Sequence, residues 1–484
     1  MMISRNVSNT ELSDTVLNYR TEGYGLINMF ASEPIDGAAV LNVIMRKGDS
    51  VIRITSDVRD RMFNSISSKN VNAEIYERLI LEHNGMEPRG LRNRTPVTYW
   101  RSGNPPLSKD RDQSKEETRI KLPHNDIRGD GIFEIPVGPV HAGVIEPGHF
   151  RFSVAGESVI KLNVHLGYTH RGVEKLMEGP VTQSRIHLAE RIAGDTTVAN
   201  SLAFSHIMEN NCQVPERAEY IRVIAAEIER IYNHLSAIGG MNTDTAFAVL
   251  SAKASKLQED ALRIAYRTFG SRYMHNVIVP GGVKKDITSE ALGDMERSLI
   301  LLKLEFDELV SKMEASNSLR DRLVTTGVLE PKIARKFRVL GPIGRASGMY
   351  TDVRKERPYD AYRYLGLNVP MESSGDVYAR TKVRMKEVHE SIDLIFQSIA
   401  MMPEGEIKSD VRADDGFRVG IVEAPRGELV HCADIRNGEV WRYSIRDPSL
   451  VNWPMMSYAV PGNVVPDFPL INKSFSLAYS GNDL

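Results

Sequence analysis

The chain has 484 residues, 42% hydrophobic and 26% charged, with a formal net charge of −2. These values are typical of a soluble protein of roughly two or three domains, and they give no basic field that would attract nucleic acid. Its two cysteines, Cys212 and Cys432, belong to no Cys-x-x-Cys pair, so we expect a reduced, cytoplasmic setting, and any redox centre that works with the chain must be held by a partner subunit.

Residues 8–105 predict a small α/β domain. A polar helix is expected to end near Tyr24, and Ala73–His83 has helical spacing. Three apolar stretches typical of strands lie between them: Leu26–Phe30, Ala39–Met45 and Val51–Thr55. Lys47-Gly48-Asp49 predicts a hairpin turn between the last two strands. Residues 106–130 are charged and almost free of apolar side chains, which predicts a solvated linker between two domains.

Residues 131–484 predict a second, larger domain. Alternating apolar residues in Phe150–Val154 and Val159–Leu166 indicate a β-hairpin. A helical stripe covers residues 216–238 and is expected to end at Gly239-Gly240. Further helices are predicted at 186–209, 247–269, 289–315 and 375–401. The expected fold class is therefore α+β, with a helical bundle, a hairpin and a C-terminal wrap of strands and loops.

Several familiar signatures are absent from the sequence. There is no G-x-G-x-x-G after a predicted strand, no G-x-x-x-x-G-K-[ST] and no H-E-x-x-H. A self-contained NAD enzyme or nucleotide hydrolase is therefore not expected. The chain begins with polar sequence and contains no run of about 18 apolar residues, so we expect neither a secretory signal nor a transmembrane segment.

Two histidines, His141 and His149, lie in a loop rich in glycine and proline just before the predicted hairpin. Such a loop can approach a ligand closely, and histidine can relay protons near neutral pH. The more ordinary interpretation is a turn whose histidines bind backbone groups. The residues alone leave both interpretations open.

Three further constellations carry candidate chemistry. His170, Arg171 and Glu174 lie at a strand-to-helix junction, where Glu174 would bind a cation or simply provide charge at a helix N-terminus. Asp244 follows an apolar helix. Its carboxyl group would either have a raised pKa and exchange protons, or cap the next helix. The segment from Glu423 to His431 places an arginine between two acids, which most often indicates an ion-pair network.

Taken in order, these motifs resemble one family: the large subunit of membrane-bound group 4 nickel–iron hydrogenases and the 49-kDa (D-type) subunit of respiratory complex I. The ordered set is Gly138-Pro139-x-His141, Glu146-Pro147-Gly148-His149-Phe150-Arg151, Gly167-Tyr168-x-His170-Arg171-Gly172-x-Glu174, Glu190-Arg191-Ile192, Pro215-x-Arg217-Ala218-Glu219, Arg345-Ala346-Ser347-Gly348 with Asp352-x-Arg354, Gly375-Asp376-Val377-Tyr378-x-Arg380, and Arg426-Gly427-Glu428. The resemblance runs from about residue 135 to the end. Residues 20–105 look like the 30-kDa (C-type) partner, fused as in hydrogenase-4-type and formate hydrogenlyase large subunits.

This resemblance implies a peripheral subunit on the cytoplasmic side of the cell membrane. The implied partners are a small subunit that carries an iron–sulfur cluster, similar to the B-type subunit of complex I, and membrane proteins that resemble antiporters and the H-type subunit of complex I. NAD, where such a complex uses it, would bind another subunit.

The sequence departs from the hydrogenases at all four cysteines that hold nickel and iron in the family. The corresponding positions are Ala193, Thr196, Ser449 and Asn452. Alanine and asparagine cannot replace thiolates at such a centre, so the chain is not expected to be a nickel–iron hydrogenase. In complex I the metal-free cavity is a quinone pocket, and His141 and Asp244 match its histidine and aspartate. His149 aligns only with a gap, and Leu202 stands at the tyrosine position.

Two hypotheses follow from the resemblance. In the first, the chain is a redox subunit in which His141, His149 and Asp244 line a quinone-type pocket and couple electron transfer to proton or ion movement. In the second, motivated by Leu202, the chain is a structural or coupling subunit of the same kind of complex that performs no chemistry.

Overall fold

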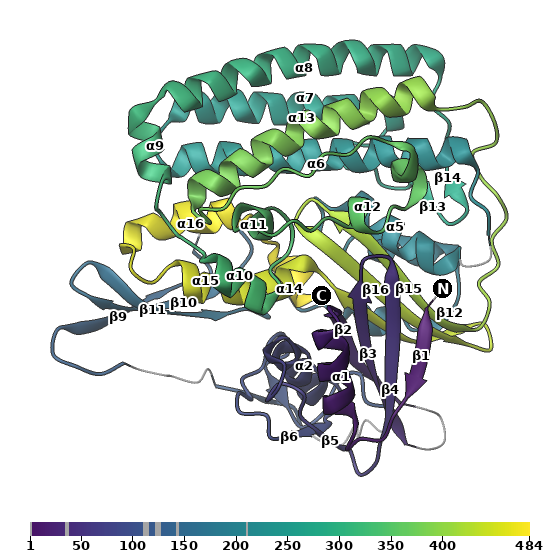
Figure 1. Cartoon of the computed structure of the whole chain (residues 1–484), viewed down its shortest axis with the longest axis vertical. Coiled ribbons are helices and arrows are strands. Elements are labelled where there is room, and N and C mark those ends of the chain that lie inside the picture. Colours follow the sequence, from purple (N-terminus) through teal and green to yellow (C-terminus); the bar gives the residue numbers. More distant parts are fainter. Residues whose placement is uncertain (1, 34–37, 110–115, 122–126, 142–144, 210–211) are drawn as a thin grey trace.

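The computed structural model describes residues 2–33, 38–109, 116–121, 127–141, 145–209 and 212–484. Long helices lie side by side at the top of Figure 1, and the sheets lie below them. The mixture of helices and several small sheets confirms the predicted α+β class. Within the described ranges, no helix combines the length and the apolar character that crossing a bilayer requires.

The N-terminal unit, residues 2–33 and 38–105, is built on a four-stranded sheet in the order β1-β4-β3-β2. The strands are β1 Ile3–Asn6, β2 Gly25–Ser32, β3 Ala39–Lys47 and β4 Ser50–Val58. The helices are α1 Leu12–Thr21 and α2 Glu74–Asn84, and α2 ends at Gly85, whose φ of 65° suits glycine. The three predicted strands and the helix near residues 73–83 are confirmed, whereas β1, which pairs in parallel with β4, was not predicted.

Side chains from the C-terminal sheet cover the free edge of β2. Arg446 donates to the carbonyl oxygen of Ile27 at 2.8 Å, and Arg442 donates to that of Ala31 at 3.0 Å. An edge strand exposes unpaired backbone groups, and these arginines satisfy them. Leu450 also packs within the core of the N-terminal unit, so the unit is built into the rest of the molecule.

The described part of the charged stretch 106–130 is not uniformly solvated. Leu107 and Ser108 are buried, and β8 Thr118–Arg119 pairs with β7 Arg101–Ser102. Residues 110–115 and 122–126 lie outside the described ranges.

The predicted hairpin is confirmed as β10 His149–Ala155 and β11 Ser158–His165. A third strand that was not predicted, β9 Ile132–Val137, pairs with the other side of β10. The apolar side chains of β10, Phe150, Phe152 and Val154, are buried in the main core. The histidine loop therefore connects two paired strands, β9 and β10, of which β10 is anchored by its side chains.

The bundle consists of α6 Glu216–Asp244, α7 Ala248–Phe269, α8 Ser289–Ala315 and α13 Val377–Met401. The prediction that the first helix ends at Gly239-Gly240 is wrong. Helix α6 continues through both glycines to Asp244. A Cβ atom at Gly239 would lie 3.5 Å from Ala254, an ordinary contact, and one at Gly240 would lie 3.2 Å from the side chain of Lys473.

The prediction of a single helix at 186–209 is also wrong. The structure has two helices, α4 Ile186–Ala189 and α5 Thr197–Met208. The buried carboxylate of Glu229 on α6 accepts hydrogen bonds from the backbone of Val198 and Ala199 at 2.6 and 3.0 Å. These bonds satisfy donors in the first turn of α5 and fix where that helix begins.

The C-terminal region forms a sheet in the order β12-β17-β16-β15. Its strands are β12 Gly179–Pro180, β15 Gly416–Ala424, β16 Gly427–Arg436 and β17 Glu439–Arg446. Short helices follow rather than the predicted loops: α14 Pro448–Asn452, α15 Met456–Ala459, α16 Phe468–Phe475 and α17 Tyr479–Asp483. The remaining described helices and strands are β5 Met62–Asn64, β6 Glu87–Arg89, α3 Val173–Leu176, β13 Ile278–Val279, β14 Gly282–Val283, α9 Asn317–Leu323, α10 Pro331–Phe337, α11 Gly341–Ala346 and α12 Val353–Glu356.

Candidate functional site

His141 and His149 both lie at the base of the β9–β10 loop, but their rings have different neighbours: the ring of His141 lies 5.6 Å from that of Phe150, and the ring of His149 lies 6.1 Å from that of His165. His141 Nδ1 lies 3.1 Å from the carbonyl oxygen of Pro139, and His149 Nδ1 lies 3.3 Å from that of Gly138. Residues 142–144 of the loop lie outside the described ranges. His141 Nε2 is buried and has no hydrogen-bond partner among the described residues. One nitrogen of each histidine thus lies against a backbone carbonyl, as the ordinary interpretation expects.

Tyr479, on α17, lies beside His141 and was missed by sequence reasoning. The two ring centroids are 6.3 Å apart. A Cβ atom at Gly148 would lie only 2.6 Å from Tyr479 Cε1, so glycine is needed there for the loop to pass the ring. Burial raises the pKa of Tyr479 to about 12, which keeps its hydroxyl protonated. Leu202 has no phenol group, but Tyr479, from another part of the chain, places a phenol ring beside His141.

Helix α17 also fixes the other end of the histidine loop. The backbone nitrogen of Ser480 donates to Glu146 at 2.9 Å. A residue at the far end of the sequence is hard to place next to residues 138–149 without a structure. The only signal was compositional: an aromatic residue in a short C-terminal segment.

Asp244 is the last residue of α6, and it is not the N-cap of the next helix. The N-cap of α7 is Phe247, without a side-chain bond, so the capping prediction is wrong. Burial raises the pKa of Asp244, and the nearby positive charge of Lys473 opposes that shift. Asp244 Oδ2 is buried and has no hydrogen-bond partner among the described residues. Among those residues there is also no recorded contact between Asp244 and His141 or His149.

His170, Arg171 and Glu174 are bound by the protein itself. His170 Nδ1 lies 2.7 Å from the carbonyl oxygen of Asp483, and Arg171 donates to the carbonyl oxygen of Ile192 at 2.7 Å. Glu174 accepts from Arg442 and from the backbone of Ile445, both at 2.7 Å. These contacts join the α3 region to α17 and β17. Glu174 lies in the first turn of α3, as expected.

The acids and arginine between Glu423 and Glu428 form ion pairs, as predicted, but not with one another. Glu423 pairs with Arg345 at 2.8 Å, and Arg426 pairs with both oxygens of Asp195 at 2.6 and 3.0 Å. Glu428 pairs with Arg46 of the N-terminal unit at 2.7 Å. The segment thus connects three separate parts of the fold.

The four positions that the resemblance assigns to the family's metal ligands are all buried. Their side chains are a methyl group, two hydroxyls and an amide, in Ala193, Thr196, Ser449 and Asn452. The three polar side chains accept hydrogen bonds within the protein: Thr196 from Asn200 at 3.2 Å, Ser449 from Ala478 at 3.1 Å and Asn452 from Leu340 at 3.0 Å. No group of three or more His, Cys, Asp or Glu side chains suited to a metal ion occurs within the described ranges. This donor set does not fit a nickel–iron centre, which requires thiolates.

Comparison with known proteins places the chain in a family. The family of the 49-kDa subunit of respiratory-chain NADH dehydrogenase matches residues 244–416. Formate hydrogenlyase subunit 5 of Escherichia coli is 33% identical over 355 residues, 72% of this chain, which spans only 62% of that protein.

Two other relatives extend the comparison. Hydrogenase-4 component G of Escherichia coli is 30% identical over 448 residues, 90% of this chain and 78% of that protein. A D-type subunit of the NADH-quinone oxidoreductase of Roseiflexus sp. is 30% identical over 362 residues, 71% of this chain and 96% of that protein. The chain therefore belongs to the family that unites the 49-kDa subunit of complex I with the large subunits of group 4 hydrogenases.

Proposed function

We propose that the chain is a peripheral redox subunit of a membrane-bound oxidoreductase related to complex I and to group 4 hydrogenases, and that it works without a nickel–iron centre. The observation that carries this proposal is the contact of His141 with Tyr479, in which His141 Nε2 is buried and left without a partner among the described residues. His149 lies at the base of the same loop. The four non-thiolate side chains at the matching ligand positions support the absence of nickel and iron.

The proposed substrate of this site is a quinone-type acceptor. His141 Nε2 and the Tyr479 hydroxyl are both able to donate hydrogen bonds to a carbonyl oxygen, which is how a quinone would be held. Reduction of a quinone to a quinol consumes protons along with electrons. A histidine is a suitable source for those protons, and burial of Asp244, which raises its pKa, makes it a suitable group to replace them. Tyr479, whose pKa burial raises to about 12, keeps its proton and is suited to donate a hydrogen bond.

Electrons for this reaction would come from an iron–sulfur cluster in a small partner subunit similar to the B-type subunit of complex I. Antiporter-like and H-type membrane proteins would hold the assembly at the cytoplasmic side of the membrane. We also assign residues 8–105 to the 30-kDa type, because the similarity to hydrogenase-4 component G covers 90% of the chain.

Membership in such an assembly can be tested with a tagged chain purified from detergent-solubilised native membranes. Co-purification of an iron–sulfur subunit and of antiporter-like membrane proteins is the expected result. Recovery of the chain alone, from the soluble fraction, would contradict the assignment.

The chemistry can be tested in the same complex with Asp244→Asn, which keeps the size of the side chain but removes its proton exchange. Electron transfer from reduced viologen to menadione should fall by about 100-fold, in line with loss of a general acid or base, while the subunit composition stays intact. Normal turnover would instead favour the structural or coupling role, to which the buried apolar side chain of Leu202 points.

A further inference from the structure

A second candidate site is a cavity that lies where the N-terminal unit meets the rest of the molecule. Its volume is about 430 Å³, and it is lined by residues of α2, β11, α10, α14 and α15. Neither loop histidine nor Asp244 lines it, although Trp453 in its wall lies 4.8 Å from Tyr479 of the site proposed for the quinone, measured between ring centroids. A cavity of this size falls within the range of small-molecule sites.

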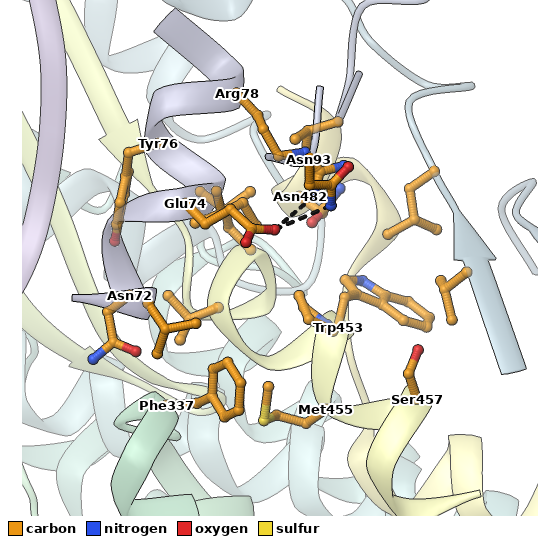
Figure 2. Close-up of a pocket in the computed structure, with 18 of the residues that line it drawn as sticks. Asn72, Glu74, Tyr76, Arg78, Asn93, Phe337, Trp453, Met455, Ser457 and Asn482 are labelled. Atoms are coloured by element: carbon orange, nitrogen blue, oxygen red, sulfur yellow. Dashed lines mark hydrogen bonds and ion pairs between the residues drawn. The ribbon is translucent and has the colours of Figure 1, made fainter. Parts of the chain in front are cut away.

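The upper end of the cavity in Figure 2 is polar, and the lower end combines Phe337 and Met455 with the polar side chains of Asn72 and Ser457. Glu74, Arg78 and Asn93 gather at the top of that view, where Asn93 donates to Glu74 at 3.0 Å. Phe337 and Met455 lie at the bottom, with Trp453 between the two ends. The polar end is held in place, because Arg78 also donates to the carbonyl oxygen of Thr95 at 2.6 Å.

The floor of the cavity is fixed by buried charges. Glu428 pairs with Arg446 and, at 2.7 Å, with Arg46, while Arg338 lies 3.8 Å away. Arg338 reaches this place over Gly25, where a Cβ atom would lie 2.1 Å from its guanidinium. A floor held by such contacts cannot collapse easily, so the cavity is preformed.

One polar atom at the cavity wall forms no hydrogen bond within the described part of the protein. Asn72 Oδ1 is buried and has no hydrogen-bond partner among the described residues. Buried polar atoms in proteins are nearly always paired, and an unpaired one at a cavity wall suits a ligand that supplies the missing donor.

We propose that this cavity binds a small planar aromatic molecule that carries hydrogen-bonding groups along one edge. Its ring would pack against Trp453 and Phe337, which offer the faces and edges that aromatic rings prefer. Its polar edge would face Glu74 and Asn93, which fix its orientation.

The test uses 1-naphthol, a two-ring molecule with one hydroxyl group, in a saturation-transfer NMR titration of the full-length chain. Ser457→Trp places a large ring in the cavity that Ser457 lines, and binding should weaken by about tenfold or more. Ser311→Trp adds the same ring at an exposed position on α8 and should leave binding unchanged. Circular dichroism checks that both variants fold, and Val451→Phe, also at the cavity wall, replaces Ser457→Trp if that variant does not.

Absence of saturable binding, or equal binding by the Ser457 and Ser311 variants, would overturn the proposal. The same titration on the purified native complex tests whether the cavity still binds 1-naphthol when the partner subunits are present. Retained binding supports a ligand site, whereas loss of binding in the complex would show that another subunit occupies the cavity, which also overturns it. These outcomes are independent of turnover, so they do not depend on the quinone proposal.

Discussion

The ion pairs around Arg354 lie in the interior and the loop that carries His141 lies at the surface, and the protein completes the bonding of the first region but not of the second. Arg354 donates to both oxygens of Asp352 at 3.0 and 2.7 Å and to both oxygens of Glu227 at 3.0 and 3.1 Å. His141 has one nitrogen bound to backbone and the other without a partner among the described residues.

The pKa values follow the same division. Burial alone would raise the pKa of Glu227, but Arg354 and Arg230 outweigh burial and lower it to about 2. Asp244 has no such partner within the described ranges, so burial dominates and its pKa rises despite Lys473. Charges with complete partners hold this fold together, and the proposed function assigns ligand contact to His141, one of the groups with an incomplete set of partners within the described ranges.

The largest expected effect is on the paired region. Arg354→Met should lower the free energy of unfolding by about 3–5 kcal/mol, because it removes the cation that the buried carboxylates of Asp352 and Glu227 share. Only the longer pairs with Arg345 and Arg230 remain. Urea unfolding measures this loss. Arg297→Ala is the matched control, since Arg297 and Asp294 form an exposed pair that contributes about 1 kcal/mol or less. Equal effects of the two substitutions would contradict the structural role of the paired region.

A smaller effect is expected on the pH dependence of folding stability. His431 is buried between the Tyr443 hydroxyl at 2.9 Å and the Asn200 amide oxygen at 3.2 Å, and burial lowers its pKa to about 3. Below pH 6.5 His431 binds a proton in the unfolded chain but stays neutral in the folded chain. Stability therefore falls as pH falls from about 6.5 towards 3. This residue should cost about 2 kcal/mol of stability between pH 7 and pH 5.

The variant His431→Gln lacks that titration. Its overall stability will be lower, but the difference between urea midpoints at pH 7 and pH 5 should be smaller than in the wild type. A difference as large as that of the wild type would show that His431 is not held neutral by its surroundings.

The smallest expected effect tests the incomplete region. Tyr479→Phe removes one hydroxyl beside His141 and should lower menadione reduction by the complex about tenfold, with stability changed by about 1 kcal/mol or less. Tyr266→Phe removes a hydroxyl from an exposed ring and serves as the control. Unchanged turnover in the Tyr479 variant would exclude its hydroxyl as a hydrogen-bond donor that the reaction needs.

Local patterns predicted most of the fold. The apolar alternation of β10 and β11 and the stripe of α6 were readable because period and burial coincide in those elements. The end of α6 was not readable, because glycine lowers helix propensity but does not by itself end a helix, and α6 continues to Asp244. The break before α5 depends on Glu229, a residue of another helix.

The candidate site was predicted in part. His141 and Asp244 could be chosen from motif order, and the structure shows that each carries a buried polar atom without a partner within the described ranges. Tyr479 could not be chosen, because its place beside His141 depends on how α17 packs against a loop from the other end of the domain. The partners of Glu423, Arg426 and Glu428 were hidden for the same reason.

The most direct test of the central claim is to measure turnover and stability together for His141→Ala and Arg354→Met in the purified complex. We predict that His141→Ala lowers viologen-to-menadione electron transfer about 100-fold while the urea midpoint and the subunit composition stay unchanged, and that Arg354→Met lowers the midpoint. Wild-type turnover in an intact His141→Ala complex would contradict the claim that the histidine loop is where this protein acts.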